Sequence, residues 1–306
     1  SLAPLASKLA PLSNLPNKIP GSGLIAEKAL GIARERDLPE FRSETLVDWF
    51  EARGGAGVSR EEADRDVLLF PDVYTTYTNP GAGKAAVRVL EAANCHVEIP
   101  DVDGSGRPPH SKGMLDVSRA TARDAVETLA PRVRDDWEVV VVEPSDAVML
   151  QSDYHDLLDG EASDVPDEDV AAVSENAYGV MEYVDAHRLD ETLSLDAPTE
   201  SLTYHGHCHQ KATKKDHHAV GVLRRAGYGV DPLDSSCCGM AGSFGYEAEH
   251  YSMSKAIGEN LFEQVDASDG DGLVAPGTSC RTQLEEGPGE VPEPSHPVEK
   301  LAAALA

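Results

Sequence analysis

Short apolar runs alternate with amphipathic stretches over most of the chain. Runs rich in Val, Ile and Leu predict strands at 67–70, 95–100, 137–143, 201–206, 228–233 and 271–276. Between these runs, apolar residues recur at helical spacing and predict helices at 83–93, 111–130, 212–226 and 248–265. Strands that bracket helices of roughly 10 to 20 residues are typical of a parallel sheet covered by helices. We therefore predict an α/β fold.

The N-terminal part and the middle of the chain do not show this alternation of strands and helices. Two further helical patterns lie at 23–36 and 43–53, and an acidic stretch at 152–200 contains one more predicted helix, over 167–187. We interpret the acidic stretch as a solvated spacer. The predicted organisation is a helical lead-in at 1–60, a first lobe at 61–150, the acidic spacer at 151–200 and a second lobe at 201–306.

The two lobes resemble each other at an offset of about 133 residues. The segment AAVRVLEAANCHVEIPDVDGSGRPPHSKG aligns with HAVGVLRRAGYGVDPLDSSCCGMAGSFG. In this alignment Cys208, Cys237-Cys238 and Cys280 of the second lobe stand opposite Thr75, Gly104-Ser105 and Asp146 of the first. Duplication followed by loss of the cysteines from one copy explains the agreement at three places. We predict two pseudo-repeated, Rossmann-like lobes, of which the first binds no metal, because iron-sulfur sites need thiolates.

The large negative net charge argues against a nucleic-acid-binding protein. The 306 residues include 26 basic and 54 acidic ones, for a formal net charge of −28, which would repel a nucleic-acid backbone. The acids are spread over every segment, so we interpret them as a halophilic surface. No apolar run approaches the roughly 18 residues of a membrane helix, and the proline-rich opening does not fit a signal peptide. We expect a cytoplasmic protein that reaches a membrane only through partners. Since the chain begins with Ser1, we also expect it to be part of a longer polypeptide.

Four of the five cysteines follow predicted strands: Cys208, Cys237, Cys238 and Cys280. Loops after parallel strands converge at one edge of a sheet, so these thiols can meet in space. Thiolates are soft ligands that select iron-sulfur clusters or zinc. The side chains of adjacent cysteines diverge along the backbone, which favours a polynuclear cluster over a single zinc ion. A third hypothesis is a thiol-redox enzyme that uses Cys237 and Cys238 without a metal. Cys95 begins a strand with no cysteine near it, and we expect it in the core.

Neighbouring residues suggest how such a site would be supported. The histidines of HGHCHQKA could bind a metal or donate to a sulfur, and we assign contact with the cofactor to His207. Gly239, in CCGMAGSFGYE, lets the backbone approach the site and donate N–H groups to it.

Two basic residues of the first lobe, Arg107 and Lys112, lie on its loop edge. If the two loop edges face each other, both cations would stabilise a negatively charged cluster. The alternative is that they pair only with local acids such as Asp101, Asp103 or Asp116.

The motifs HGHCHQKA, DSSCCGMAGSFGYE and GTSCRTQ resemble the second copy of the cysteine-rich CCG domain. This domain occurs in one of the subunits of heterodisulfide reductase, in iron-sulfur subunits of glycolate oxidase and in FAD-linked oxidases of D-2-hydroxy acids. The first half resembles the degenerate first copy in the D-lactate and D-2-hydroxyglutarate dehydrogenases, so the resemblance covers roughly residues 40–306. Cys280 departs from the family's closing C-x-x-C, because Gln283 stands where the second cysteine would be.

The resemblance implies an iron-sulfur electron-transfer module of an oxidoreductase of the glycolate or D-lactate type. The expected cofactor is a four-iron cluster, held by the four cysteines of the second lobe, that passes electrons from a flavin to an acceptor. The FAD would sit on a partner domain or subunit that also carries a ferredoxin-like domain. The chain alone is not expected to oxidise a 2-hydroxy acid. The alternative function is a zinc-stabilised interaction domain that docks the catalytic partner.

Overall fold

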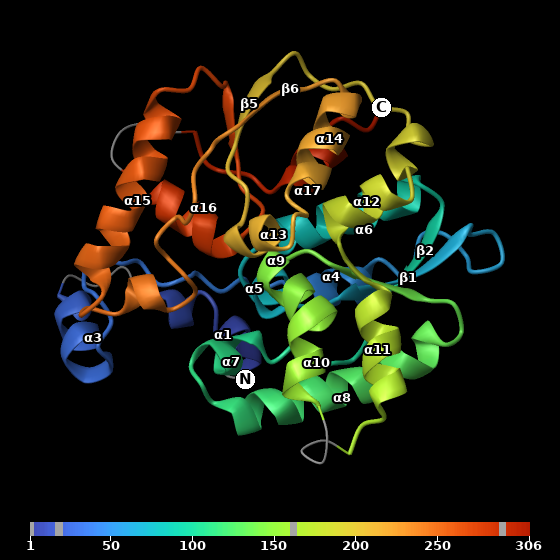
Figure 1. Cartoon of the computed structure of the whole chain (residues 1–306), viewed down its shortest axis with the longest axis horizontal. Helices are drawn as coiled ribbons and strands as arrows, with labels where there is room; N and C mark the ends of the chain where they lie inside the picture. Colours follow the sequence, from blue (N-terminus) through green and yellow to red (C-terminus); the bar gives the residue numbers. More distant parts are fainter. Residues whose placement is uncertain (1–2, 16–20, 160–163, 288–291) are drawn as a thin grey trace.

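The computed structural model describes residues 3–15, 21–159, 164–287 and 292–306. Within these residues the strands form a four-stranded sheet in the order β2-β1-β3-β4 and a three-stranded sheet in the order β6-β5-β7. All neighbouring strands are parallel, and helices pack around both sheets (Figure 1). The predicted α/β class with two Rossmann-like lobes is confirmed.

The first sheet comprises β1 (Arg65–Phe70), β2 (Cys95–Glu98), β3 (Glu138–Val141) and β4 (Ala177–Gly179). Its helices are α5 (Val73–Tyr77), α6 (Pro80–Ala92), α7 (Arg107–Ser111), α8 (Leu115–Val133), α9 (Pro144–Val148), α10 (Tyr154–Leu157), α11 (Asp167–Glu175) and α12 (Val180–Ala186), with a π-helical turn at Met149–Asp153. Val67 and Leu69 of β1 enter one apolar core, whereas Leu68 and Phe70 enter another. Both faces are therefore buried, which explains why the strands appear in the sequence as continuous apolar runs.

The second sheet comprises β5 (Ser201–Tyr204), β6 (Gly229–Pro232) and β7 (Gly272–Val274). Its helices are α13 (Cys208–Ala212), α14 (His217–Ala226), α15 (Tyr251–Asp266), α16 (Thr278–Glu285) and α17 (Pro297–Ala303), with short 3-10 turns at Leu189–Glu191 and Phe244–Tyr246. One core lies between the sheets and joins Val140 of β3 and Val184 of α12 to Leu202 of β5. Another, on the opposite face of the second sheet, contains Cys238 and Cys280.

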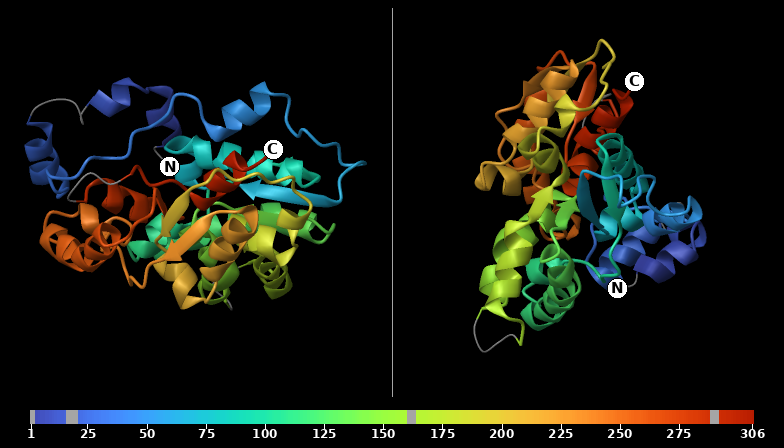
Figure 2. Two further views of the ribbon diagram at one scale, coloured as in Figure 1. Left: turned by 90° about the horizontal axis from the view of Figure 1, so that it is seen from above. Right: turned by 90° about the vertical axis from the view of Figure 1, so that its right-hand side faces the viewer.

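The N-terminal segment lies on the outside of the molecule, against the helices that follow β1 (Figure 2). It contains α1 (Ala3–Lys8), a 3-10 turn at Leu12–Asn14, α3 (Ser22–Leu30) and α4 (Leu46–Ala52). The helix predicted at 23–36 ends early, because Gly31 adopts a left-handed conformation (φ 69°) and caps α3. The side chain of Arg36 is fully buried and donates to the carbonyl of Gly245 (2.8 Å) and to Ser254 Oγ (2.9 Å). This segment is therefore attached to the loop that carries the cysteine pair.

The helix predicted over 167–187 is wrong. Residues Ala177–Gly179 are extended and pair with β3, so that a strand separates α11 from α12. Tyr183 and Val184 of α12 are fully buried in the core between the sheets. This part of the chain therefore belongs to the core and is not a solvated spacer. The division of the whole chain into domains stays a prediction. In the described residues, no helix combines the length and the apolar character that crossing a membrane requires.

Candidate metal centre

The cysteines of the second lobe meet at the carboxyl edge of the second sheet. Cys208 opens α13 after β5, Cys237 and Cys238 lie in the loop between β6 and α15, and Cys280 is the third residue of α16 after β7. Three loops far apart in sequence therefore converge, as the strand pattern predicts. All five cysteines of the chain are free thiols.

The four sulfur atoms form a continuous chain of contacts. Cys237 interacts with Cys208 and Cys238, and Cys238 in turn interacts with Cys280. The pKa of Cys237 and that of Cys280 lie below the usual range, because neighbouring thiols donate to their sulfurs. The same contacts raise the pKa of Cys208 and that of Cys238. Four sulfurs in successive contact are a suitable donor set for a soft cation or a cluster.

His205 completes this donor set. A ring nitrogen of His205 and the sulfurs of Cys238 and Cys280 lie within 4.8 Å of one another. His205 is fully buried, its Nδ1 is 2.7 Å from Ser235 Oγ, and its ring also interacts with the sulfur of Cys280. An imidazole nitrogen and thiol sulfurs gathered in one buried place are donors that soft and borderline metals bind. These residues therefore fit a metal or an iron-sulfur cluster.

The sequence favoured His207 over His205. His207 is buried, and its Nδ1 accepts from the backbone N–H of His209 (3.3 Å) at the start of α13. A signal for His205 was present in strand alternation: Leu202 and Tyr204 enter the core between the sheets, so His205 belongs to the face that carries the cysteines. A direct role of His207 toward a cofactor stays a prediction.

Gly239 occupies the position that the sequence led us to expect. It adopts a left-handed conformation (φ 89°), and its N–H donates to Cys237 Sγ over 3.3 Å. A Cβ at this position would lie 2.2 Å from the carbonyl oxygen of Ser254. The close packing of this turn against α15 therefore requires glycine.

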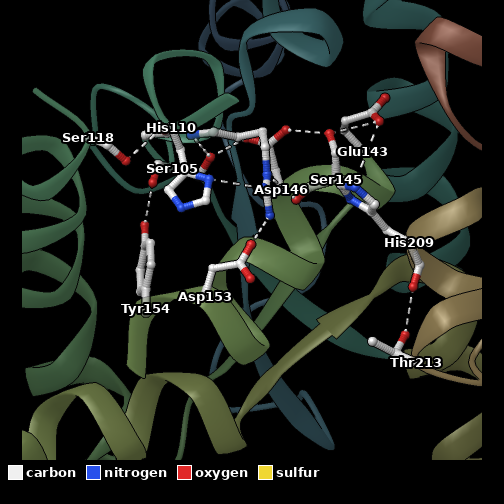
Figure 3. Close-up of polar contacts among 12 residues, drawn as sticks. Ser105, His110, Ser118, Glu143, Ser145, Asp146, Asp153, Tyr154, His209 and Thr213 are labelled. Atoms are coloured by element: carbon white, nitrogen blue, oxygen red, sulfur yellow. Dashed lines mark hydrogen bonds and ion pairs between the residues drawn. The ribbon is translucent and has the colours of Figure 1, made fainter. Parts of the chain in front are cut away.

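The equivalent edge of the first sheet holds buried polar groups in place of sulfurs. Ser105 donates a hydrogen bond to Asp146 (Figure 3), and Asp72 lies nearby with no exposed surface. Burial and the charge of Asp72 raise the pKa of Asp146 to about 8. Burial and the charge of Glu143 raise the pKa of Asp72 to about 6. The prediction that this lobe binds no metal stays a prediction.

Backbone geometry supports the alignment of the lobes at Ser105. Gly106 (φ 84°) lies against Ser118 just as Gly239 lies against Ser254, which places Ser105 opposite Cys238. At the other slot, Asp72 and His207 are both helix N-caps, and counting from these caps would place Val73 opposite Cys208. The equivalence of Thr75 and Cys208 stays a prediction.

The loop edges of the lobes face each other. Lys112 forms an ion pair with Glu247 of the second lobe. Arg107 forms an ion pair with Asp153 and donates to the carbonyl of Ser145 over 3.0 Å. Both cations thus pair with carboxylates other than Asp101, Asp103 and Asp116, and because Lys112 pairs with the other lobe, the alternative of local pairs alone does not hold for it. Because carboxylates already engage both cations, their contact with a cofactor stays a prediction.

Cys95 lies outside this site. It is fully buried in β2, and burial raises its pKa to about 12. The prediction that it packs in the core is confirmed.

Comparison with known proteins agrees with the motifs. Residues 202–285, which include all four converging cysteines, match the model of the cysteine-rich domain family CCG. This part of the chain is thus similar to the CCG domain. CCG domains are rich in cysteine, and this part offers donors for a metal or an iron-sulfur cluster.

Several dehydrogenases and related proteins are similar over longer ranges. One of the subunits of anaerobic glycerol-3-phosphate dehydrogenase of Escherichia coli K12 is 27% identical over 99% of this chain and 74% of the relative. D-2-hydroxyglutarate dehydrogenase of the same organism is 24% identical over 98% of the chain but only 29% of the relative. Lactate utilization protein A of Geobacillus sp. WCH70 is 21% identical over 67% of the chain. The resemblance inferred from the motifs is confirmed, and two of these three relatives are named as a dehydrogenase or as a subunit of one.

Proposed function

We propose that this chain is the iron-sulfur electron-transfer module of an FAD-linked oxidoreductase. The observation that carries the proposal is the convergence of four thiols and the buried ring of His205 at the carboxyl edge of the second sheet. A bound four-iron cluster would supply one-electron transfer at this edge. Cys208, Cys237, Cys238 and Cys280 would hold the cluster.

The surrounding residues would tune and protect the cofactor. The N–H of Gly239, already directed at Cys237 Sγ, would stabilise negative charge on sulfur. Cys238 and Cys280 are almost completely buried, whereas Cys208 and Cys237 are partly exposed. Electrons would therefore enter or leave more readily on the side of Cys208 and Cys237, because solvent and partners can approach there.

The substrate would belong to the partner that carries the flavin. The names of the three relatives share one chemistry, since glycerol 3-phosphate, D-2-hydroxyglutarate and lactate each contain a secondary alcohol. We infer that the partner oxidises a secondary alcohol to a ketone with FAD, and that this chain takes the electrons onward. Glycolate, a primary alcohol, remains a narrower prediction from the motifs, as do a ferredoxin-like partner domain and a cytoplasmic location.

Anaerobic reconstitution followed by reduction tests this function. The chain reconstituted with iron and sulfide should absorb in the visible range, bleach on addition of dithionite and give an electron paramagnetic resonance signal. Zinc bound without a visible chromophore would instead support a zinc-stabilised docking domain. A folded chain that takes up neither metal would contradict both functions.

A further inference from the structure

A carboxylate of the first lobe contacts the helix that carries Cys280. Glu143 follows β3, is 4% exposed and caps α9 in its own lobe, where its Oε1 accepts from Ser145 Oγ over 3.1 Å (Figure 3). Its second oxygen, Oε2, accepts from the backbone N–H of Thr278 over 2.9 Å. Thr278 is the first residue of α16, and Cys280 is the third. One carboxylate therefore binds the first turns of two helices, one in each lobe.

Helix α16 needs this external partner. The first N–H groups of a helix have no partner within it, and a Ser, Thr, Asp or Asn side chain at the N-cap commonly satisfies one of them. The N-cap of α16 is Gly277, which has no side chain. A Cβ at Gly277 would lie 2.3 Å from Cδ2 of His207, so the ring of His207 leaves no room for a capping residue. Glu143 of the first lobe therefore supplies the hydrogen-bond acceptor that the N-cap of α16 lacks.

We propose that Glu143 is a positioning residue for the cysteine site. It fixes the first turn of α16 and with it the place of Cys280, and its negative charge faces the end of the helix that carries this ligand. The charge part of this proposal rests on the proposed function. A carboxylate close to a buried redox centre disfavours the addition of an electron, because the two negative charges repel. The first lobe thereby lowers the reduction potential of a cluster bound to the second.

Two substitutions separate the hydrogen bond from the charge. Glu143→Gln retains a side-chain oxygen that can accept from Thr278 but removes the charge, whereas Glu143→Ala removes both. Asp48→Asn is a matched control, because Asp48 is also a capping carboxylate but belongs to the capping box of α4.

Hydrogen exchange in the cluster-free full chain tests the positioning role. The first amides of α16 should exchange about fivefold faster in Glu143→Ala than in wild type, as expected for loss of a helix cap. Glu143→Gln and Asp48→Asn should leave exchange in this peptide near wild type. Wild-type protection of α16 in Glu143→Ala would overturn the positioning role.

Redox titration of the reconstituted chain tests the charge. Glu143→Gln should bind as much iron as wild type, with a midpoint potential shifted to a more positive value, while Asp48→Asn should not shift it. A merely structural contact predicts equal potentials for wild type and Glu143→Gln, and that result would overturn the role of the charge. If wild type binds no iron, the proposed function fails, but hydrogen exchange still decides whether Glu143 positions α16.

Discussion

Ser105 donates a buried hydrogen bond to Asp146 at the place in the first lobe where Cys238 contacts Cys280 in the second. The repeat thus keeps a side-chain contact between the same two loops while the chemistry changes from sulfur to oxygen. In the second lobe the contact holds soft donors, whereas in the first it holds a carboxyl group with a raised pKa.

Asp146 should make stability depend on pH. Its folded-state pKa of about 8 lies above the ordinary value of 3.8, so the native chain binds a proton more tightly than the unfolded chain. The stabilisation is fully present below pH 4 and is lost as the pH rises toward 8. Asp146→Asn imitates the protonated form and cannot titrate. Between pH 4 and 8 the free energy of unfolding of wild type should therefore fall with pH more steeply than that of Asp146→Asn, by about 1.4 kcal/mol per pH unit.

Urea unfolding at constant high salt between pH 4 and 8 measures this linkage. The exposed Asp124→Asn serves as the control and should follow wild type. Parallel curves for wild type and Asp146→Asn would mean that Asp146 does not hold this proton.

Arg36 should contribute strongly to stability. Its buried guanidinium lies 2.5 Å from the carboxylate of Glu286, just past α16, and also binds the loop that carries the cysteine pair. Removing one partner of such a pair leaves a partly buried charge unpaired, so Arg36→Ala should lower the free energy of unfolding by about 3 kcal/mol. Arg34→Ala, which removes an exposed ion pair with Glu35, should leave the urea midpoint unchanged. Equal effects of the two substitutions would contradict this account of Arg36.

Two glycines of the cysteine loop should differ in their tolerance of a side chain. Both Gly239 and Gly242 have positive φ, but a Cβ would clash with Ser254 only at Gly239, whereas at Gly242 it would meet none of the described residues within 4 Å. Gly242→Ala should cost about 1 kcal/mol of stability from backbone strain alone. Gly239→Ala should cost clearly more and reduce iron uptake. Thermal unfolding and iron analysis compare the two, and equal tolerance would argue against the tight turn.

The acidic surface predicts dependence on salt. With a net charge of −28, self-repulsion should grow at low ionic strength, where the Debye length reaches about 30 Å at 0.01 M. We expect the melting temperature to rise steadily from millimolar to molar potassium chloride. A melting temperature indifferent to salt would count against the halophilic interpretation.

Local patterns were sufficient for much of the fold. The continuous apolar runs at β1 and β3 identified buried parallel strands, because both of their faces enter a core. The strand β4 was missed, since its three residues between two helices are too few to show a period of two. The four cysteines were found because parallel strands bring the loops that follow them to one edge.

Contacts between distant segments could not be predicted in this way. The bond from Glu143 to Thr278 and the ion pair of Lys112 with Glu247 each join residues 135 positions apart. Their formation depends on how the two sheets pack through their shared core, which no local periodicity records. The position of His205 was predictable only in part. Alternation along β5 indicates the face of the sheet on which His205 lies, but not that its ring nitrogen lies close to the sulfurs of Cys238 and Cys280.

The most direct test of the central claim is the iron and acid-labile sulfide content of cysteine variants after anaerobic reconstitution. Wild type should hold about four iron and four sulfide ions per chain, as expected of a four-iron cluster. Cys95→Ser, which changes a thiol in the core, should hold the same amount, whereas Cys208→Ser, Cys237→Ser, Cys238→Ser and Cys280→Ser should each lose most of it. Iron retained in full by the last four variants, or absent from folded wild type, would contradict the account.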